Sequence, residues 1–145
     1  MLNNLLIRHE ILRQIQGKFI AFLATSEGDQ PKVRVVELVS LDDNFYLATG
    51  SDNAKVDQIR LNPKTEFCLL IEKENKSGSL RVECRAKIIE DVDLKTIMYN
   101  RVEEWWEFYD SPNDPRYTLI ELKPTFFIYN KPGTLIIESL ESQGQ

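Results

Sequence analysis

The spacing of apolar residues changes along the chain from a helical period to a strand-like one. Near the N-terminus, Ile7, Ile11 and Ile15 fall on one side of a helix that the pattern places at residues 4–16. Further on, residues 80–88 alternate strictly between apolar and charged side chains, which predicts a strand with one buried face. The chain therefore begins with an amphipathic helix and continues as β-structure.

Short apolar runs, separated by turn-forming residues, predict the remaining elements. We expect strands at residues 19–25, 32–41, 45–49, 64–73 and 117–130, in addition to residues 80–88. A short helix is expected before Asn62-Pro63, and a longer one from a cap at Asp91 to about Trp106. A turn is expected at residues 74–79, and the polar residues 138–145 are expected to be a frayed tail. Strands that do not alternate regularly with helices favour an antiparallel barrel or sandwich with helices at its edges.

Length and charge are typical of one soluble domain. The chain has 145 residues, with 18 basic against 23 acidic side chains, so we expect a single domain over residues 1–145 with its barrel at about 18–130. The acidic excess argues against a nucleic-acid partner. The N-terminal apolar run is interrupted by charged residues and no segment is long enough to span a membrane, so we expect a cytoplasmic protein without a membrane partner.

Several kinds of catalytic chemistry are poorly supported. His9 is the only histidine, and Cys68 and Cys84 do not complete a zinc pattern with it, so no metal site is expected. The two cysteines are interpreted as buried thiols, with a disulfide left open. No phosphate-binding glycine loop occurs. If the protein is an enzyme, we therefore expect a bound cofactor to carry the reaction.

Two cations are candidates for binding an anion. Lys55 lies in the first turn of the short predicted helix, shortly after a strand that ends in Thr49. Alone, this pattern favours a capped surface helix, because helix caps are common. Arg34, however, lies in the strongly apolar strand KVRVVELV, and an arginine buried there needs an anionic partner. Arg34 and Lys55 could therefore meet one phosphate, with the free amides of the helix start beside it. The alternatives are that Arg34 reaches the rim of the barrel or pairs with a distant carboxylate.

The order of these motifs resembles a known family. Residues 19–63, FIAFLATSEGDQPKVRVVELVSLDDNFYLATGSDNAKVDQIRLNP, resemble the core of the pyridoxamine-phosphate-oxidase-like, FMN-binding split-barrel family. The shared features are an FLAT-type strand, an R-x-V segment, a strand ending in Thr, a Lys six residues later and a closing Asn-Pro. DPRYTLIELKP, residues 114–124, is similar to a late strand of the general stress protein-type flavoproteins in this group. The resemblance covers roughly residues 5–130.

The resemblance implies a fold, a cofactor and a site. The fold would be mainly β with flanking helices, an antiparallel split β-barrel, and the protein a homodimer with FMN at the subunit interface. Arg34 and Lys55 would hold the FMN phosphate, and Ser79 falls where the family often has a glutamine that contacts the flavin, although an ordinary turn residue is an equal interpretation. The positions expected to flank the isoalloxazine are Val35, Val36, Glu37, Ala48 and Thr49.

The departures from the family pattern limit the functional prediction. Ala54 stands where many relatives have an arginine, and the chain lacks the Trp- and Arg-bearing C-terminal segment of true pyridoxamine-phosphate oxidases, so vitamin B6 oxidation is not supported. We expect an FMN-binding oxidoreductase that transfers hydride or electrons to or from a small molecule. The alternatives are a non-catalytic flavin-binding or sensing protein, a deazaflavin in place of FMN, and an interaction module without a cofactor.

Overall fold

The computed structural model describes residues 2–142, with the side chains of residues 2 and 3 left aside. The described elements, in chain order, are α1 (Leu2–Gln14), β1 (Lys18–Glu27), β2 (Gln30–Leu41), β3 (Asn44–Gly50), α2 (Ala54–Leu61), β4 (Lys64–Lys73), β5 (Lys76–Ile89), α3 (Val92–Arg101), the 3-10 helix η1 (Glu103–Glu107), β6 (Tyr117–Asn130) and β7 (Ile137–Glu141). Most of the predicted elements occur at their expected places.

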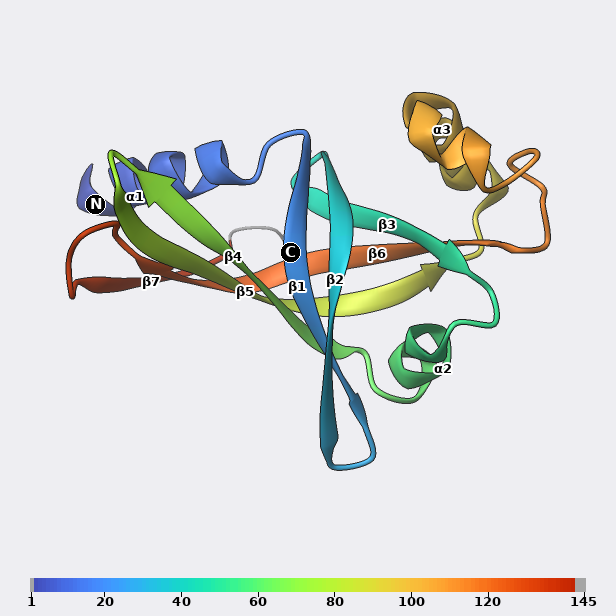
Figure 1. Ribbon diagram of the computed structural model, residues 1–145, viewed down its shortest axis with the longest axis horizontal. Coiled ribbons are helices and arrows are strands. Elements are labelled where there is room, and N and C mark those ends of the chain that lie inside the picture. Colours follow the sequence, from blue (N-terminus) through green and yellow to red (C-terminus); the bar gives the residue numbers. More distant parts are fainter. Residues whose placement is uncertain (1, 143–145) are drawn as a thin grey trace.

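The strands form one antiparallel sheet that closes on itself (Figure 1). The strand order is β3-β2-β1-β4-β5-β6-β7, and a further pairing of β3 with β6 completes the ring. The long strand β6 makes this closure because its first half pairs with β3, from Tyr117 to Leu122, and its second half pairs with β7. The predicted antiparallel barrel is thus confirmed.

Tight turns fix the register of two hairpins. Asp42 and Asp43 connect β2 to β3, and Glu74 and Asn75 connect β4 to β5, all four with positive φ angles between 51° and 67°. Positive φ at both central residues is the conformation whose twist matches the flanking strands. The turn predicted at residues 74–79 is therefore wrong in its extent, because β5 already begins at Lys76.

The barrel interior contains the main hydrophobic core. On β5, Leu80, Val82, Cys84 and Ala86 face inward, and the charged residues between them are exposed, as the alternation predicted. The rings of Phe45 and Phe67 meet edge to face, with centroids 5.2 Å apart. Ile11 of helix α1 and Ile15, just after the helix, cover the core, and both are buried.

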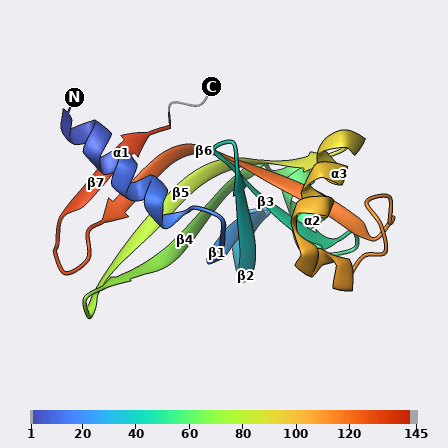
Figure 2. The ribbon, with the colours of Figure 1, turned by 90° about the horizontal axis from the view of Figure 1, so that it is seen from above.

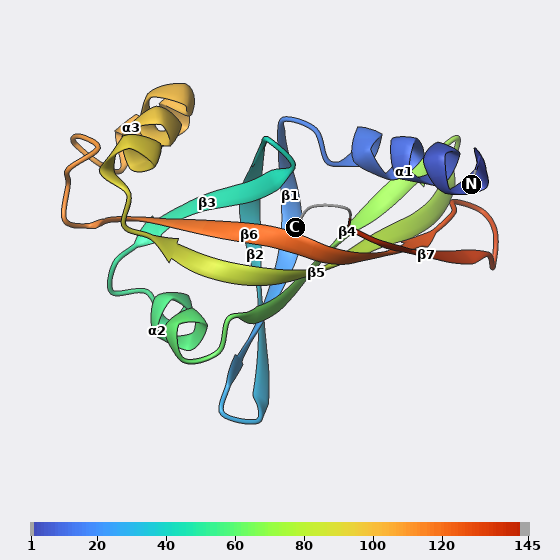
Figure 3. The ribbon, with the colours of Figure 1, turned by 180° about the vertical axis from the view of Figure 1, so that it is seen from behind.

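A second hydrophobic cluster lies outside the barrel, under α3 and η1. Met98, Trp105 and Tyr117 belong to it, together with Tyr46 of β3. Figures 2 and 3 show α1 and α3 at opposite ends of the molecule. The helix predicted from Asp91 to Trp106 is not continuous, because α3 ends at Arg101 and η1 follows a break at Val102.

The C-terminal residues correct another prediction. Residues 138–141 of the expected polar tail belong to β7, which pairs with β6 and places Leu140 opposite Phe127. Leu140 is only 8 % exposed and packs into the main core. Its single apolar side chain among polar neighbours gave too weak a pattern for a strand prediction. Residues 143–145 lie outside the described part of the chain.

Substitution of Leu140 tests whether β7 belongs to the folded core. We expect Leu140→Ala to lower the free energy of unfolding by about 2–5 kcal/mol, because it leaves a cavity between strands. The matched control is Ile137→Ala on the same strand, where the side chain is 65 % exposed and little change is expected. Urea unfolding followed by circular dichroism measures both. Equal, small effects would contradict the packing of β7.

Candidate functional site

Lys55 is a buried cation at the start of α2. Asn53 caps this helix by accepting a hydrogen bond from the backbone N–H of Lys55, at 3.1 Å. The Lys55 side chain is almost fully buried, and its Nζ donates to Thr49 Oγ1 and Asn53 Oδ1, each at 3.0 Å. Both acceptors are neutral. The ammonium is therefore oriented without being paired to a negative charge.

Arg34 is the second cation of the site and is half-buried on β2. Its guanidinium donates to the carbonyl oxygen of Leu23 at 3.1 Å and to Gln58 Oε1 at 2.8 Å. Burial, and then the positive charge of Arg34, lower the pKa of Lys55 below its usual 10.5. In the described part of the chain, no ion pair includes either cation. The two side chains thus form a positive centre without a carboxylate partner.

A pocket of about 250 Å³ adjoins Lys55. It lies where β2 and β3 separate, because these strands pair only from Val39 to Leu41 and leave residues 35–37 unpaired on that side. The pocket is lined by Val35, Val36, Glu37, Leu47, Ala48, Lys55, Glu104, Trp105, Phe108 and Tyr109. The lining thus combines residues of β2 and β3 with an aromatic wall of Trp105, Phe108 and Tyr109.

The segment after α3 supplies the aromatic wall. Tyr99 of α3 donates its hydroxyl hydrogen bond to the carbonyl oxygen of Tyr109 at 2.5 Å, which ties this segment to the helix. Asp114 closes the following loop by accepting hydrogen bonds from the backbone N–H groups of Asp110 and Arg116. The Arg116 guanidinium bonds the same carboxylate and holds the pKa of Asp114 well below its usual range. The wall is thus part of a fixed loop.

The structure brings together most of the predicted site residues. Five of them line the pocket, Thr49 bonds Lys55, and Arg34 lies beside it. Ser79 does not line this pocket, because it lies at the far end of β5, opposite Leu70 and Asn130. The roles of these residues toward a cofactor stay predictions.

Sequence reasoning missed part of the pocket lining. Phe108 and Tyr109 were not predicted, although the aromatic run WWEFYD was a visible signal. Trp105 is buried and also lines the pocket. Trp106 does not line the pocket: its ring lies near that of Tyr99, and its indole N–H donates to the Tyr99 carbonyl oxygen at 2.8 Å.

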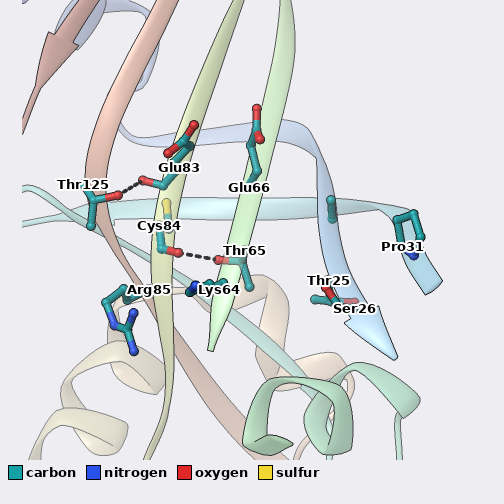
Figure 4. Close-up of a pocket in the computed structure, with 11 residues that line it drawn as sticks. Thr25, Ser26, Pro31, Lys64, Thr65, Glu66, Glu83, Cys84, Arg85 and Thr125 are labelled. Atoms are coloured by element: carbon teal, nitrogen blue, oxygen red, sulfur yellow. Dashed lines mark hydrogen bonds between the residues drawn. The ribbon is translucent and has the colours of Figure 1, made fainter. Parts of the chain in front are cut away.

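A larger groove of about 500 Å³ lies between β1, β4 and β5 (Figure 4). Lys64 and Arg85 lie opposite each other in the sheet, and Glu66 and Glu83 form a facing pair two residues further along the same strands. These mixed charges do not favour one class of ligand. Cys84 lines the groove, and burial raises the pKa of its thiol, so it stays protonated and unreactive.

The two cysteines and the acidic residues provide no further centre. Cys68 and Cys84 are both free thiols, the first half-buried and the second buried. Within residues 2–142, no group of three or more His, Cys, Asp or Glu side chains is placed to hold a metal ion. No described helix is both long enough and apolar enough to cross a membrane.

Comparison with known proteins decides the family. The sequence model of the pyridoxamine 5'-phosphate oxidase family matches residues 7–130. The chain belongs to this family. The general stress protein 26 of Bacillus anthracis has a similar structure, with 26 % identity, a TM-score of 0.75, and coverage of 94 % of this chain and 98 % of that one. The predicted split-barrel fold of the pyridoxamine 5'-phosphate oxidase family is therefore confirmed.

More distant members of the same fold bind different ligands. An FAD-binding protein from Mesorhizobium loti is 14 % identical, with a TM-score of 0.69 and coverage of 89 % and 93 % of the two chains. The heme storage protein of Vibrio cholerae is 15 % identical, with a TM-score of 0.64 and coverage of 90 % and 97 %. No protein with a curated description matches this chain. The fold alone therefore does not determine which ligand this chain binds.

The burial of Lys55 predicts a stability effect. Because folding lowers the Lys55 pKa, the unfolded state binds more protons in the alkaline range, so stability rises there with pH. At neutral pH the folded protein holds the Lys55 ammonium largely out of water, which lowers its free energy of unfolding. We expect Lys55→Met to raise the free energy of unfolding of the protein without ligand by on the order of 1 kcal/mol.

The control for this prediction is Lys64→Met, since Lys64 is exposed and its replacement should change stability little. Thermal unfolding of both variants at neutral pH, without added ligand, makes the comparison. A clear loss of stability in Lys55→Met would show that the hydrogen bonds of Nζ outweigh its desolvation.

Proposed function

We propose that this protein binds FMN, with Arg34 and Lys55 holding the phosphate. The observation that carries this proposal is the positive centre itself: two neighbouring cations, one buried, with no carboxylate partner in the described part of the chain. Burying an unpaired charge is unfavourable, so such a pair is retained where an anion completes it. A phosphate accepts charge-assisted hydrogen bonds from both groups.

The donor set fits a phosphate. Lys55 offers an ammonium, Arg34 a guanidinium, and the start of α2 adds backbone N–H groups with the positive end of the helix dipole. Thr49 and Asn53 hold the ammonium by neutral oxygens, so its charge stays available. Ala54 is exposed and adds no charge where many relatives are expected to have arginine. The phosphate would thus be held by two side-chain cations.

The pocket next to these cations fits a planar ring system. The unpaired edge of β2 at residues 35–37 presents backbone donors and acceptors, as the polar edge of a flavin requires. Trp105 and Phe108 line the opposite side, where aromatic surface can cover a flat ring and exclude water. Heme is less well supported because no histidine lines this pocket, His9 being on α1.

An oxidoreductase is the function we favour. FMN supplies hydride or electron transfer when bound, and the chain supplies binding, orientation and exclusion of water. A second candidate is a flavin carrier or sensor, which the pocket's titratable groups favour. Glu104 is paired with Lys18, and burial, followed by the charge of Asp114, raises the pKa of Tyr109. The shift of Tyr109 is away from neutral pH and so does not suit this phenol to acid–base work.

We further propose that a second copy of the chain completes the site. A contiguous apolar face lies on β1, β2 and β4, where Phe22 is opposite both Val35 and Cys68. Its exposed apolar residues are Ile20, Phe22, Val33, Val35 and Leu70. The Glu66–Arg81 ion pair borders it. An apolar centre with a polar rim is the usual anatomy of a protein interface.

This face reaches the pocket through Val35, which belongs to both. The pocket, at about 250 Å³, is smaller than the roughly 300–1,000 Å³ typical of ligand sites. A homodimer would add the missing wall. Ser79 lies opposite Leu70, at the edge of the same face, so a flavin contact by Ser79 would be made to the partner subunit's pocket.

Binding measurements with FMN and riboflavin test the phosphate assignment. The protein should bind FMN and become yellow, and Arg34→Ala and Lys55→Ala should each weaken FMN binding by about ten- to a hundred-fold. Riboflavin, which lacks the phosphate, should be affected much less. Fluorescence titration measures both dissociation constants. Equal weakening of the two ligands would contradict the phosphate clamp, and a protein that stays colourless in excess FMN would contradict flavin binding altogether.

Reduction of the bound flavin separates a catalyst from a carrier. An oxidoreductase should be bleached by NADH or NADPH and should regain its colour in air, faster than free FMN under the same conditions. Stopped-flow absorbance of the FMN-loaded protein measures both steps. Flavin that stays oxidised with either nucleotide would favour the carrier or sensor over an enzyme that uses these reductants.

Analytical ultracentrifugation tests the dimer. We expect the unsubstituted protein to sediment as a dimer and Ile20→Asp to raise the dimer dissociation constant at least about ten-fold, because it places a charge in the apolar face. The control is Leu135→Asp, at an exposed position in the loop between β6 and β7. A dimer that tolerates Ile20→Asp as well as Leu135→Asp would rule out this face as the interface.

A further inference from the structure

Gln58 is a buried residue of α2 that bonds both strands of the β1–β2 hairpin. It follows Lys55 by three residues on α2, is 5 % exposed, and uses both ends of its amide. Its Oε1 accepts from Arg34 Nη2 at 2.8 Å and from Thr25 Oγ1 at 2.6 Å. Its Nε2 donates to Glu27 Oε1 at 3.2 Å. One side chain thus connects Arg34 to a carboxylate without bringing the two charges together.

The chemistry of the neighbours fixes the amide orientation. Arg34 can only donate and the ionised Glu27 carboxylate can only accept, so the reverse orientation would place like groups against each other on both sides. The oxygen therefore faces Arg34. A neutral acceptor orients the guanidinium but leaves its full positive charge for another anion, whereas a carboxylate at the same place would neutralise it.

We infer that Gln58 is a positioning residue, which orients Arg34 toward the anion site beside Lys55 and separates its charge from Glu27. This inference rests on the proposed binding of FMN phosphate by Arg34 and Lys55. The second contact of Arg34, to the carbonyl oxygen of Leu23, is also neutral, so the whole support of the guanidinium avoids negative charge. The residue acts through Arg34 and belongs to the recognition of the phosphate rather than of the flavin ring.

Two substitutions separate charge from packing. Gln58→Glu keeps the shape and the acceptor toward Arg34 but adds the negative charge, so we expect FMN to bind at least about ten-fold more weakly while riboflavin changes less than about two-fold. Gln58→Met keeps the length and removes the acceptor, and we expect FMN binding to fall about three-fold or more, again without a matching change for riboflavin. The control for net charge is Gln16→Glu, at an exposed position after α1, which should change neither affinity.

A double-variant cycle tests whether the effect passes through Arg34. In an Arg34→Ala background, Gln58→Glu should lose most of its ten-fold effect on FMN, because no guanidinium remains for it to neutralise. If Gln58→Glu does not fold, Gln58→Met carries the comparison, with thermal unfolding as the check. Riboflavin losses that equal FMN losses in the folded Gln58 variants would overturn the inference and indicate a structural role only.

The same titrations distinguish failure of the inference from failure of the proposed function. If Arg34→Ala and Lys55→Ala leave the ratio of FMN to riboflavin affinity unchanged, the phosphate clamp itself is wrong. If those variants change the ratio and the Gln58 variants do not, the clamp stands and Gln58 does not position it. If all of them change the ratio, and the cycle shows coupling between Arg34 and Gln58, the inference is supported.

Discussion

The separation of β2 and β3 determines where the candidate site lies. The two strands pair for only three residues beyond their turn, whereas the other edge of β3 pairs with β6 from Phe45 to Gly50. A strand edge with unpaired backbone groups would normally invite another strand. Here the gap is bordered by α2 and by the segment after α3, which leaves a pocket at the opening. The ring of strands is therefore closed between β3 and β6 and partly open between β2 and β3.

Beside this gap between the strands, the site has two positive charges that no carboxylate of the described residues neutralises. Arg34 and Lys55 are both oriented by neutral oxygen atoms, and each raises the electrostatic cost of the other's charge. Proteins often accept local instability where a ligand later relieves it. The arrangement is therefore understandable for binding an anion, whereas for stability alone an apolar residue at position 55 would be the simpler choice.

Local sequence patterns could predict the elements that have a regular apolar period or clear turn-forming and helix-ending residues. The strict alternation on β5, the turn at Asp42-Asp43 and the short helix before Asn62-Pro63 all follow from neighbouring residues. The β7 strand was missed because Leu140 finds its partner across the sheet in Phe127, a contact that no local pattern reveals. Arg34 and Lys55 could be selected from the sequence because an arginine is unusual in an apolar strand and a lysine is unusual in the first turn of a helix. Gln58 could not, because a glutamine on a short helix is ordinary until its three partners are known.

The two hydrophobic clusters support different sides of the pocket. The barrel core supports β2 and α2, and so the cations, whereas the cluster beneath α3 and η1 supports the aromatic wall. Changes in residues 102–116 can therefore reshape one side of the pocket without repacking the barrel. The two cations and the aromatic side of the pocket thus belong to separate regions of the chain. A fold divided in this way can acquire new specificities through a single loop while the anion centre stays the same.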